Sequence, residues 1–580
     1  MPGIFGTNIY NNMPEKIMEE ENRIYRNENI NTWHLEMSSI KKFENDKIMY
    51  KDENYTVLVE GVILNLSKLK EKFNKNEMQD LIIEMYKKNG EKFFSEFRGN
   101  FCGFFEDKIK NKTIIFTNQT GDKTIFFYNV KSEIIFASEI KHIIKFMKYN
   151  DIKYNLDKKG VYCLLTYGYM YDNLTLIKEI KKLLPGHYIK IENNKIEEIE
   201  YYKLKTNIDK DVTMSEDEIL EKIEKKFQEA MMLQVSKNEE YGYDNFAPLS
   251  AGLDSRMTNY MLRKIYKKDI YNITYSQTGQ LDQIVPSKIA SELHNHWIFK
   301  NLDNGLALYN IQKSTDITDG IIYYAWPSQL YDYMKLINTE NMGIVHTGVI
   351  GDVVLATFYK SYDKKNYQIG DGAFSKTLIN KLSEMITIKE YDNYEVGMLY
   401  NRAFNGAVLG YSTTFQNYTE AMSPFMNIEF MEFCFSLPLK YRFGHYIYYK
   451  WVEKYHKDAM KYAHNGVKIP KSNSVKVTIK RKKYTINMIL NIIKNKLKLK
   501  TDPKSNMNPM QYWYETNKDL REKLDTYYQK NKKLLDNDNE LKNDIEKLYK
   551  EGSAIEKIEV ISLLSFLEKY FNKENKKDEI

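Results

Sequence analysis

The stretch "NFAPLSAGLDSRM" (245–257) constrains the fold of this chain more than any other part of it. An apolar strand ends at Leu249 and is followed by a turn of small residues. Apolar residues then recur at helical spacing, at Leu253, Met257, Met261 and Ile265. The sequence therefore predicts a strand, a tight turn and a helix in direct succession.

The same alternation continues after about residue 215. Long amphipathic helical stretches alternate with short apolar segments at 270–277 and 343–348. Such alternation is typical of βαβ units around a parallel sheet. Ligands of these sheets bind beyond the carboxyl ends of the strands, so the residues that follow each strand are the candidates for a site.

The first part of the chain has a different pattern. Up to about residue 205, short runs of β-branched and aromatic residues are separated by polar turns, and one helix is expected at 79–90. The apolar "GIFG" near the start predicts a strand from the third residue onward. This pattern indicates a layered α+β domain.

The turn at 249–255 has the chemistry of a phosphate site. A small-residue turn that leads into a helix exposes backbone N–H groups and the positive end of the helix dipole. Ser250 and Ser255 add hydroxyl donors, and Asp254 offers a carboxylate to a magnesium ion carried by the phosphates. No GxxxxGK[ST] pattern of the Walker type occurs in the chain. The residues expected to bind a phosphate-bearing ligand here are Leu249, Ser250, Ala251, Gly252, Asp254 and Ser255.

A second candidate segment, "HTGVIGDVV" (346–354), follows another predicted strand. Thr347 and Gly348 are small enough to let a nucleotide approach the backbone, and Asp352 is placed to share a metal ion with Asp254. An ordinary loop is the alternative for this segment taken alone.

These segments resemble the asparagine synthetase superfamily, in collinear order over most of residues 1–470. "LSAGLDS" is similar to the SGGxDS pyrophosphate loop, with Ala251 in place of the first glycine, and "TGVIGD" occupies the place of the SGEGxD segment. The remaining similar segments are "FASEIKHII" (136–144), "IKEIKKLLPGHYIKI" (177–191) and "EAMSPFMN" (420–427).

The resemblance implies a fold and a division of the chain. Residues 1–205 are expected to form an α+β glutaminase-like domain of the N-terminal-nucleophile type, and 206–480 an α/β parallel-sheet ATP-pyrophosphatase domain. Residues 481–580 are expected to form a basic and helical C-terminal extension.

The expected glutaminase domain lacks the residues of its chemistry. The family places a nucleophilic cysteine directly after the initiator methionine, where this chain has Pro2. Glu60 replaces the asparagine that would stabilise the oxyanion, and Val62 replaces the glutamate that would hold the substrate amine. Cys102 lies in an apolar strand and is interpreted as a core residue. We therefore expect a catalytically inactive domain.

The expected synthetase half lacks one proton-accepting residue of the family and retains candidates for the general base and for the late lysine. Val349 replaces the glutamate or tyrosine of relatives and cannot relay a proton, so Glu420 or the substrate's own amine must act as the base. The family also uses a late lysine, for which Lys468 and Lys471 are the candidates by order. Two solvated lysines at the start of the basic run 468–500 are the alternative. That run is interpreted as a solvated amphipathic surface, with an acidic peptide, a carrier protein or a membrane surface as alternative partners.

The resemblance implies ATP-dependent amide-bond formation with Mg²⁺. A substrate carboxylate attacks ATP, pyrophosphate leaves, and an amine attacks the acyl-adenylate. β-Lactam synthetases and lasso-peptide cyclases combine a degenerate first domain with such a second domain, which favours a ligase of peptide or secondary-metabolite maturation. The alternatives are an asparagine synthetase that uses free ammonia and a non-catalytic scaffold.

Composition limits the partners and the compartment. The formal net charge of +7 is small for 580 residues, so it indicates no nucleic-acid partner. Three separated cysteines form no CxxC pair, which favours a reducing cytoplasm. No leader and no apolar stretch long enough to span a membrane is evident. The expected partners are small-molecule or peptide substrates that carry a carboxylate and an amine, with a precursor peptide or a partner enzyme as further possibilities.

Overall fold

The computed structural model describes most of the chain. The described residues are 2–463, apart from 10–12, 15, 19, 21–22 and 31, together with 476–479, 482–485 and 506–572. Lys468 and Lys471 lie outside them. Within the predicted basic run, β18 (Lys476–Ile479) and β19 (Lys482–Thr485) pair in antiparallel fashion.

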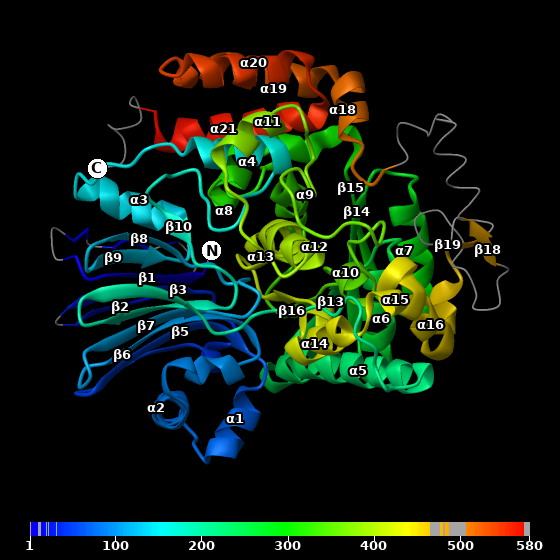
Figure 1. Cartoon of the computed structure of the whole chain (residues 1–580), viewed down its shortest axis with the longest axis horizontal. Coiled ribbons are helices and arrows are strands. Elements are labelled where there is room, and N and C mark those ends of the chain that lie inside the picture. Colours follow the sequence, from blue (N-terminus) through cyan, green and yellow to red (C-terminus); the bar gives the residue numbers. More distant parts are fainter. Residues whose placement is uncertain are drawn as a thin grey trace.

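The first half of the chain forms two antiparallel sheets of six strands each, which lie together at the left of Figure 1. In spatial order, one sheet contains β10 (Lys181–Lys182), β8 (Phe126–Val130), β9 (Glu133–Ala137), β1 (Gly3–Thr7), β3 (Trp33–Ser39) and β2 (Ile24–Ile30). The other contains β12 (Lys195–Glu200), β11 (His187–Glu192), β7 (Lys112–Thr117), β6 (Gly99–Asp107), β5 (Tyr55–Ile63) and β4 (Ile48–Lys51). The predicted strands are confirmed, and β1 lies inside its sheet between β9 and β3.

The two sheets pack face to face and helices cover their outer faces. Leu58, Phe104 and Phe136 belong to the apolar cluster between the sheets. On the outer faces, α1 (Leu66–Phe73) and α2 (Met78–Asn89) cover the β5 sheet, and α3 (Ile140–Tyr149) and α4 (Lys158–Tyr167) cover the β1 sheet. The layered α+β prediction is therefore confirmed.

The second half is built around a parallel sheet of five strands, as the alternating pattern predicts. Its spatial order is β15 (His296–Asn301), β14 (Ile270–Ser276), β13 (Asp244–Pro248), β16 (Met342–His346) and β17 (Ala421–Met422). Because β13 and β16 are neighbours, the loops after them meet at one edge of the sheet. Long helices flank this sheet: α5 (Glu216–Tyr241), α6 (Leu253–Ile265) and α7 (Leu281–Glu292).

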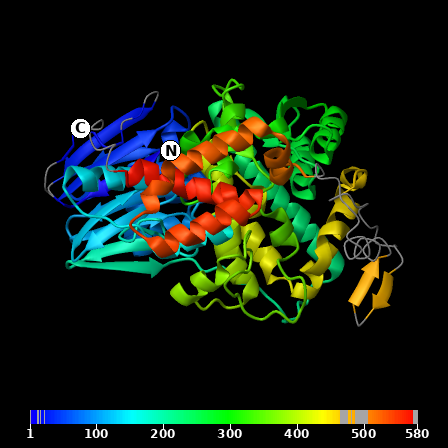
Figure 2. The ribbon, with the colours of Figure 1, turned by 90° about the horizontal axis from the view of Figure 1, so that it is seen from above.

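The C-terminal helices pack back onto the molecule. They are α18 (Met510–Thr516), α19 (Lys518–Asn531), α20 (Asn539–Glu551) and α21 (Ala554–Tyr570). α21 is apolar on nearly all faces and almost wholly buried, and it contacts α4 and α8 (Ile311–Thr318). Figures 1 and 2 show these helices, in orange and red, lying over both of those elements. The stretch expected as an extension thus contributes to the core.

Shorter helices complete the second half. They are α9 (Ala325–Met334), α10 (Gly351–Leu355), α11 (Ile379–Met385), α12 (Tyr394–Met398), a π-helical segment (Leu399–Val408), α13 (Leu409–Phe415), α14 (Ile428–Ser436), α15 (Leu439–Arg442) and α16 (Tyr446–Tyr455). No helix among the described residues is both long enough and apolar enough to cross a bilayer.

Candidate functional site

The turn between β13 and α6 is closed by two serine hydroxyls. Ser250 Oγ lies 2.9 Å from Ser255 Oγ, which also accepts a hydrogen bond from the Ser250 N–H at 3.0 Å. Ser250 Oγ accepts a further bond from the Gly252 N–H at 3.1 Å. Gly252 is the N-cap residue of α6 and supplies no side-chain cap, so the first turn of the helix presents uncapped N–H groups. This geometry suits a phosphate group at the positive end of the helix dipole.

Ala251 is held from behind by α7. Its N–H donates to Asp282 Oδ1 at 2.8 Å, and its methyl group belongs to a small apolar cluster with Val285 and Ile289. Asp282, on the first turn of α7, therefore fastens the loop to that helix. Because Ala251 is 7% exposed, its methyl group is part of the core beneath the loop.

The two predicted metal-binding aspartates lie together at the sheet edge. Asp254 Oδ2 accepts a hydrogen bond from the Asp352 N–H at 2.9 Å, and Asp254 Oδ1 accepts one from the Tyr448 hydroxyl at 2.7 Å. Burial and the nearby Asp352 carboxylate raise the pKa of Asp254 well above its ordinary value. A divalent cation would offset this concentration of negative charge, and carboxylate oxygens are ligands that Mg²⁺ prefers.

The second segment approaches the backbone of α6 closely. A Cβ atom at Gly348 would lie 2.6 Å from the Ser255 nitrogen and 2.7 Å from the Asp254 carbonyl carbon. The Thr347 carbonyl accepts a hydrogen bond from the Thr258 hydroxyl at 3.3 Å. Gly348 is thus required by the contact between the two loops, whether or not a nucleotide is bound.

Ile350 has an unusual backbone conformation for a β-branched residue. Its φ is 60°, in the left-handed region that favours glycine, and it occupies the fourth position of the segment, where SGEGxD has a glycine. Such strain costs about 1–3 kcal/mol and is found most often at functional sites.

Arg256 was missed by the sequence analysis, although it directly follows the motif. Its guanidinium is fully buried and donates to the carbonyl of Ala251 at 2.5 Å, to Ala459 at 3.0 Å and to Tyr462 at 2.8 Å. It also donates to the carbonyl of Ala463. Burial lowers its pKa to about 10, so the side chain stays charged at neutral pH. Arg256 therefore joins the loop to the segment that leads toward Lys468 and Lys471.

Glu420 directly precedes β17, and its side chain points toward the first half of the chain. Its Oε1 is 2.7 Å from Lys123 Nζ, and its Oε2 accepts a hydrogen bond from Asn100 Nδ2 at 3.3 Å. Val349 is partly buried, and its carbonyl accepts a bond from the Ser423 hydroxyl at 2.9 Å. The structure therefore brings together the two aspartates and the serine loop, while Glu420 contacts the junction between the halves.

Comparisons with known proteins give one matching domain model and several similar proteins. A model of the glutamine amidotransferase domain matches residues 19–202. A putative glutamine-hydrolysing asparagine synthetase of Methanocaldococcus jannaschii is 25% identical over 45% of this chain and 52% of its own length. A Bacillus subtilis asparagine synthetase of the same description is 32% identical over 16% of this chain and 13% of its own. The chain belongs to the asparagine synthetase-like superfamily.

Another similar protein is named as an amidase. Amidase chry2 of Gibberella zeae is 24% identical over 45% of this chain and 38% of its own length. The chain thus spans about half or less of the length of these curated relatives. A solved amidotransferase from B. subtilis covers 47% of this chain and 53% of its own at 8% identity, with a TM-score of 0.21, which is too low to describe a shared fold.

The positions that differ from the family's glutaminase are buried in this superfamily member. Pro2 is buried where the chain enters β1, and Glu60 and Val62 are fully buried on β5. Cys102 pairs with Glu60 across the β5–β6 ladder and has no exposed surface. Burial and the Glu60 carboxylate raise the pKa of the Cys102 thiol to about 12, so it is a poor nucleophile.

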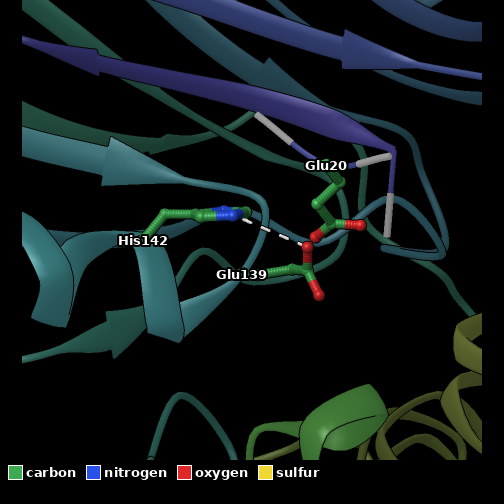
Figure 3. Close-up of side chains that lie close together, drawn as sticks. All are labelled: Glu20, Glu139 and His142. Carbon is green, nitrogen blue, oxygen red and sulfur yellow. Dashed lines mark ion pairs between the residues drawn. The ribbon is translucent and has the colours of Figure 1, made fainter. Parts of the chain in front are cut away.

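Figure 3 shows a cluster of three side chains, two carboxylates and one imidazole, of the kinds that bind metal ions. Ligand atoms of Glu20, Glu139 and His142 lie within 4.8 Å of one another. Lys141 Nζ, however, is 3.0 Å from an oxygen of each carboxylate. Burial lowers the pKa of His142 to about 3, so its ring adds no charge. Lys141 supplies the positive charge that these carboxylates need, and we assign no metal ion to them.

Proposed function

We propose that this chain is an ATP-dependent, AMP-forming synthetase that activates a carboxylate and joins it to an amine without hydrolysing glutamine. The observation that carries the proposal is the meeting of the serine-closed loop with Asp254 and Asp352 at the ends of two neighbouring parallel strands. Superfamily membership supports the same class of reaction.

The roles follow from the chemistry of the residues. Residues 249–255, with Thr347 and Gly348, bind the phosphates of ATP through backbone N–H groups and hydroxyls. Asp254 and Asp352 hold Mg²⁺, which supplies positive charge to the departing pyrophosphate. Glu420 accepts the proton of the amine, and Lys468 or Lys471 stabilises developing negative charge, which for one donor is worth about 10²–10³ in rate.

The amine has a source other than glutamine in this proposal. Pro2 offers no nucleophilic side chain. Cys102 is the cysteine in the described apolar core between the two sheets, and its thiol is buried and has a raised pKa. The amine then belongs to the substrate itself, to a second substrate or to free ammonia. The first two sources fit a ligase that acts in peptide or secondary-metabolite maturation.

Pyrophosphate release with different substrates tests the proposal. We expect ATP and Mg²⁺ to give pyrophosphate and AMP only with a carboxylate that belongs to a peptide or an amino-acid derivative. Release with aspartate and ammonium would instead identify an ammonia-dependent asparagine synthetase. If the protein binds no ATP and releases no pyrophosphate with any carboxylate, the proposal is contradicted and a non-catalytic scaffold is supported.

A further inference from the structure

The substituted glutaminase positions face the second half of the chain. Side chains alternate along β5, so Val59 and Ile63 pack toward α1 and α2, whereas Glu60 and Val62 point to the opposite face. On that face Val62 lies in an apolar cluster with Ile344 of β16 and Met422 of β17. One of the altered positions is therefore a packing contact between the halves.

The other altered position, Glu60, enters a buried ion network that crosses the same boundary. Lys123 Nζ is 2.9 Å from Glu60 Oε2 and 2.7 Å from Glu420 Oε1. All three side chains are at most 2% exposed. Lys47 Nζ lies 3.8 Å from Glu60 Oε1 and supplies a second positive charge. Two buried carboxylates from different halves thus share one buried ammonium group.

The network determines the charge of Glu420. Burial raises the pKa of Glu420, whereas the ammonium group of Lys123 opposes that rise. The same two carboxylates raise the pKa of Lys123 despite its burial, so it stays charged. The titratable groups that face Glu420 are Lys123, Glu60, Lys47, Cys102 and Asp122. Among them Lys123 lies closest to the Glu420 carboxylate, with 2.7 Å between Nζ and Oε1.

We propose that Lys123, anchored by Glu60, is a positioning residue that keeps Glu420 ionised and fixed in place for the reaction of the second half. The first half would then act on the synthetase through this ion network instead of supplying ammonia. This inference rests on the proposed function, because a general base must be ionised to accept a proton.

The test separates this role from a purely structural one. Lys123→Met alone leaves two buried carboxylates short of positive charge and is expected to destabilise the protein, so it is combined with Glu60→Gln. In the double variant we expect the acid limb of the pH–rate profile to move up, by less than the about 1–3 pH units that loss of an opposite charge alone produces, because Glu60→Gln also removes a like charge that raises the pKa of Glu420. kcat should fall about tenfold at neutral pH while KM for ATP is unchanged, and Lys123→Arg should retain most of the activity.

A matched control uses another buried ion pair between the halves. Lys237 Nζ lies 3.2 Å from Asp46 Oδ1, and both side chains are fully buried without contacting Glu420. Lys237→Met with Asp46→Asn is expected to change the melting temperature and to leave the pH–rate profile unchanged. An equal shift in both double variants would overturn the proposal.

A second measurement needs no substrate. Infrared spectra of the Lys123→Met, Glu60→Gln protein at neutral pH should contain an additional protonated-carboxyl band, beyond those of the wild type, and Glu420→Gln should remove it. Absence of this band contradicts the inference. If the band is present and no carboxylate gives pyrophosphate in the wild type, the proposed function fails while the control of Glu420 by Lys123 stands.

Discussion

The junction at Glu60 and the loop at Asp254 each bring carboxylates together, but they differ in burial and in how their charge is neutralised. The junction carboxylates are buried, whereas at the loop Asp254 is half-buried and Asp352 is exposed. At the junction, Lys123 contacts both carboxylates within 2.9 Å. At the loop, neither Asp254 nor Asp352 has a Lys or Arg ion pair within the part of the chain that the structure describes. The carboxylates of the first cluster are compensated by Lys123, whereas those of the second carry negative charge that a bound cation can compensate.

This difference indicates which of the two regions can take up a charged ligand. A completed ion network holds two parts of a protein together and fixes the charge and position of its members. An uncompensated carboxylate beside uncapped helix N–H groups costs stability and is retained where function requires it. The predictions below test this contrast.

The largest effect is expected for Asp254→Asn. The amide cannot supply a negatively charged ligand to Mg²⁺, so exchange of labelled pyrophosphate into ATP should fall by about 10²–10³ or more. The variant should fold normally, because it removes a charge whose burial is unfavourable. Asp269→Asn is the control, since the Asp269 side chain is 74% exposed and lies before β14. A fully active Asp254→Asn protein would refute the metal role.

A large effect on stability is expected for Arg256→Met. The change leaves four backbone carbonyls without their charged donor, in the loop and in the segment around Tyr462. We expect the free energy of unfolding to fall by about 3 kcal/mol or more, measured by urea denaturation. Arg263→Met, on the same helix, is the control: Arg263 donates to Asn295 and to three backbone carbonyls, but its bonds are only partly buried or exposed, so the change should cost less. Equal losses would show that Arg256 has no special part in bracing the loop.

Glu559 tests the premise that a nearby lysine is what keeps a buried carboxylate ionised. Its oxygens have no hydrogen-bond partner among the described residues, and burial together with Glu556 raises its pKa well above 4.5. The folded protein then holds a proton that the unfolded chain releases, so stability should fall as pH rises from about 4.5 toward the folded pKa. The fall should be about 1.4 kcal/mol for each pH unit in that interval.

Glu559→Gln should remove that fall and stabilise the protein at alkaline pH. Glu556→Gln is the matched control one turn earlier on α21, where the carboxylate accepts hydrogen bonds from Ser375 and Thr377. Glu556→Gln should destabilise the protein. Thermal unfolding followed across the pH range measures both, and an unchanged pH slope in Glu559→Gln would contradict the premise.

Gly348→Ala should have a moderate effect. Its methyl group would overlap the backbone of Asp254 and Ser255, which cannot move without shifting the start of α6. We expect a loss of about 1–3 kcal/mol in the free energy of unfolding. At Gly252 an added methyl group would meet only the Ser250 hydroxyl at 3.1 Å, and φ is −68°, so Gly252→Ala should cost less than 1 kcal/mol. The reverse order would show that the two loops do not pack as described.

The sequence predicted the strands, the parallel sheet and the loop because each is encoded locally. Apolar periodicity and a small-residue turn suffice for β13, α6 and their connection. It did not predict the contact of Lys123 with Glu420 or that of Tyr448 with Asp254, because these partners lie almost 300 and almost 200 residues apart in the chain. A single lysine before an apolar run carries no signal of burial. Arg256 had a weak signal, since an arginine on the buried first turn of a helix needs acceptors.

The smallest effect is expected where the sequence departs most plainly from the family, at Pro2→Cys. A new thiol at this position, with removal of Met1 verified by mass spectrometry, restores the nucleophile but not its surroundings. Glu60 remains paired with Lys123, and Val62 remains packed against Met422. We therefore expect no glutamate release from glutamine above the wild-type background. Cys102→Ser in the same protein excludes a contribution from the buried thiol. Glutamate release at an enzymatic rate would contradict this expectation. It would show that glutamine still reaches the site near the junction, and that the side chain at position 2 alone accounts for the lost glutaminase activity.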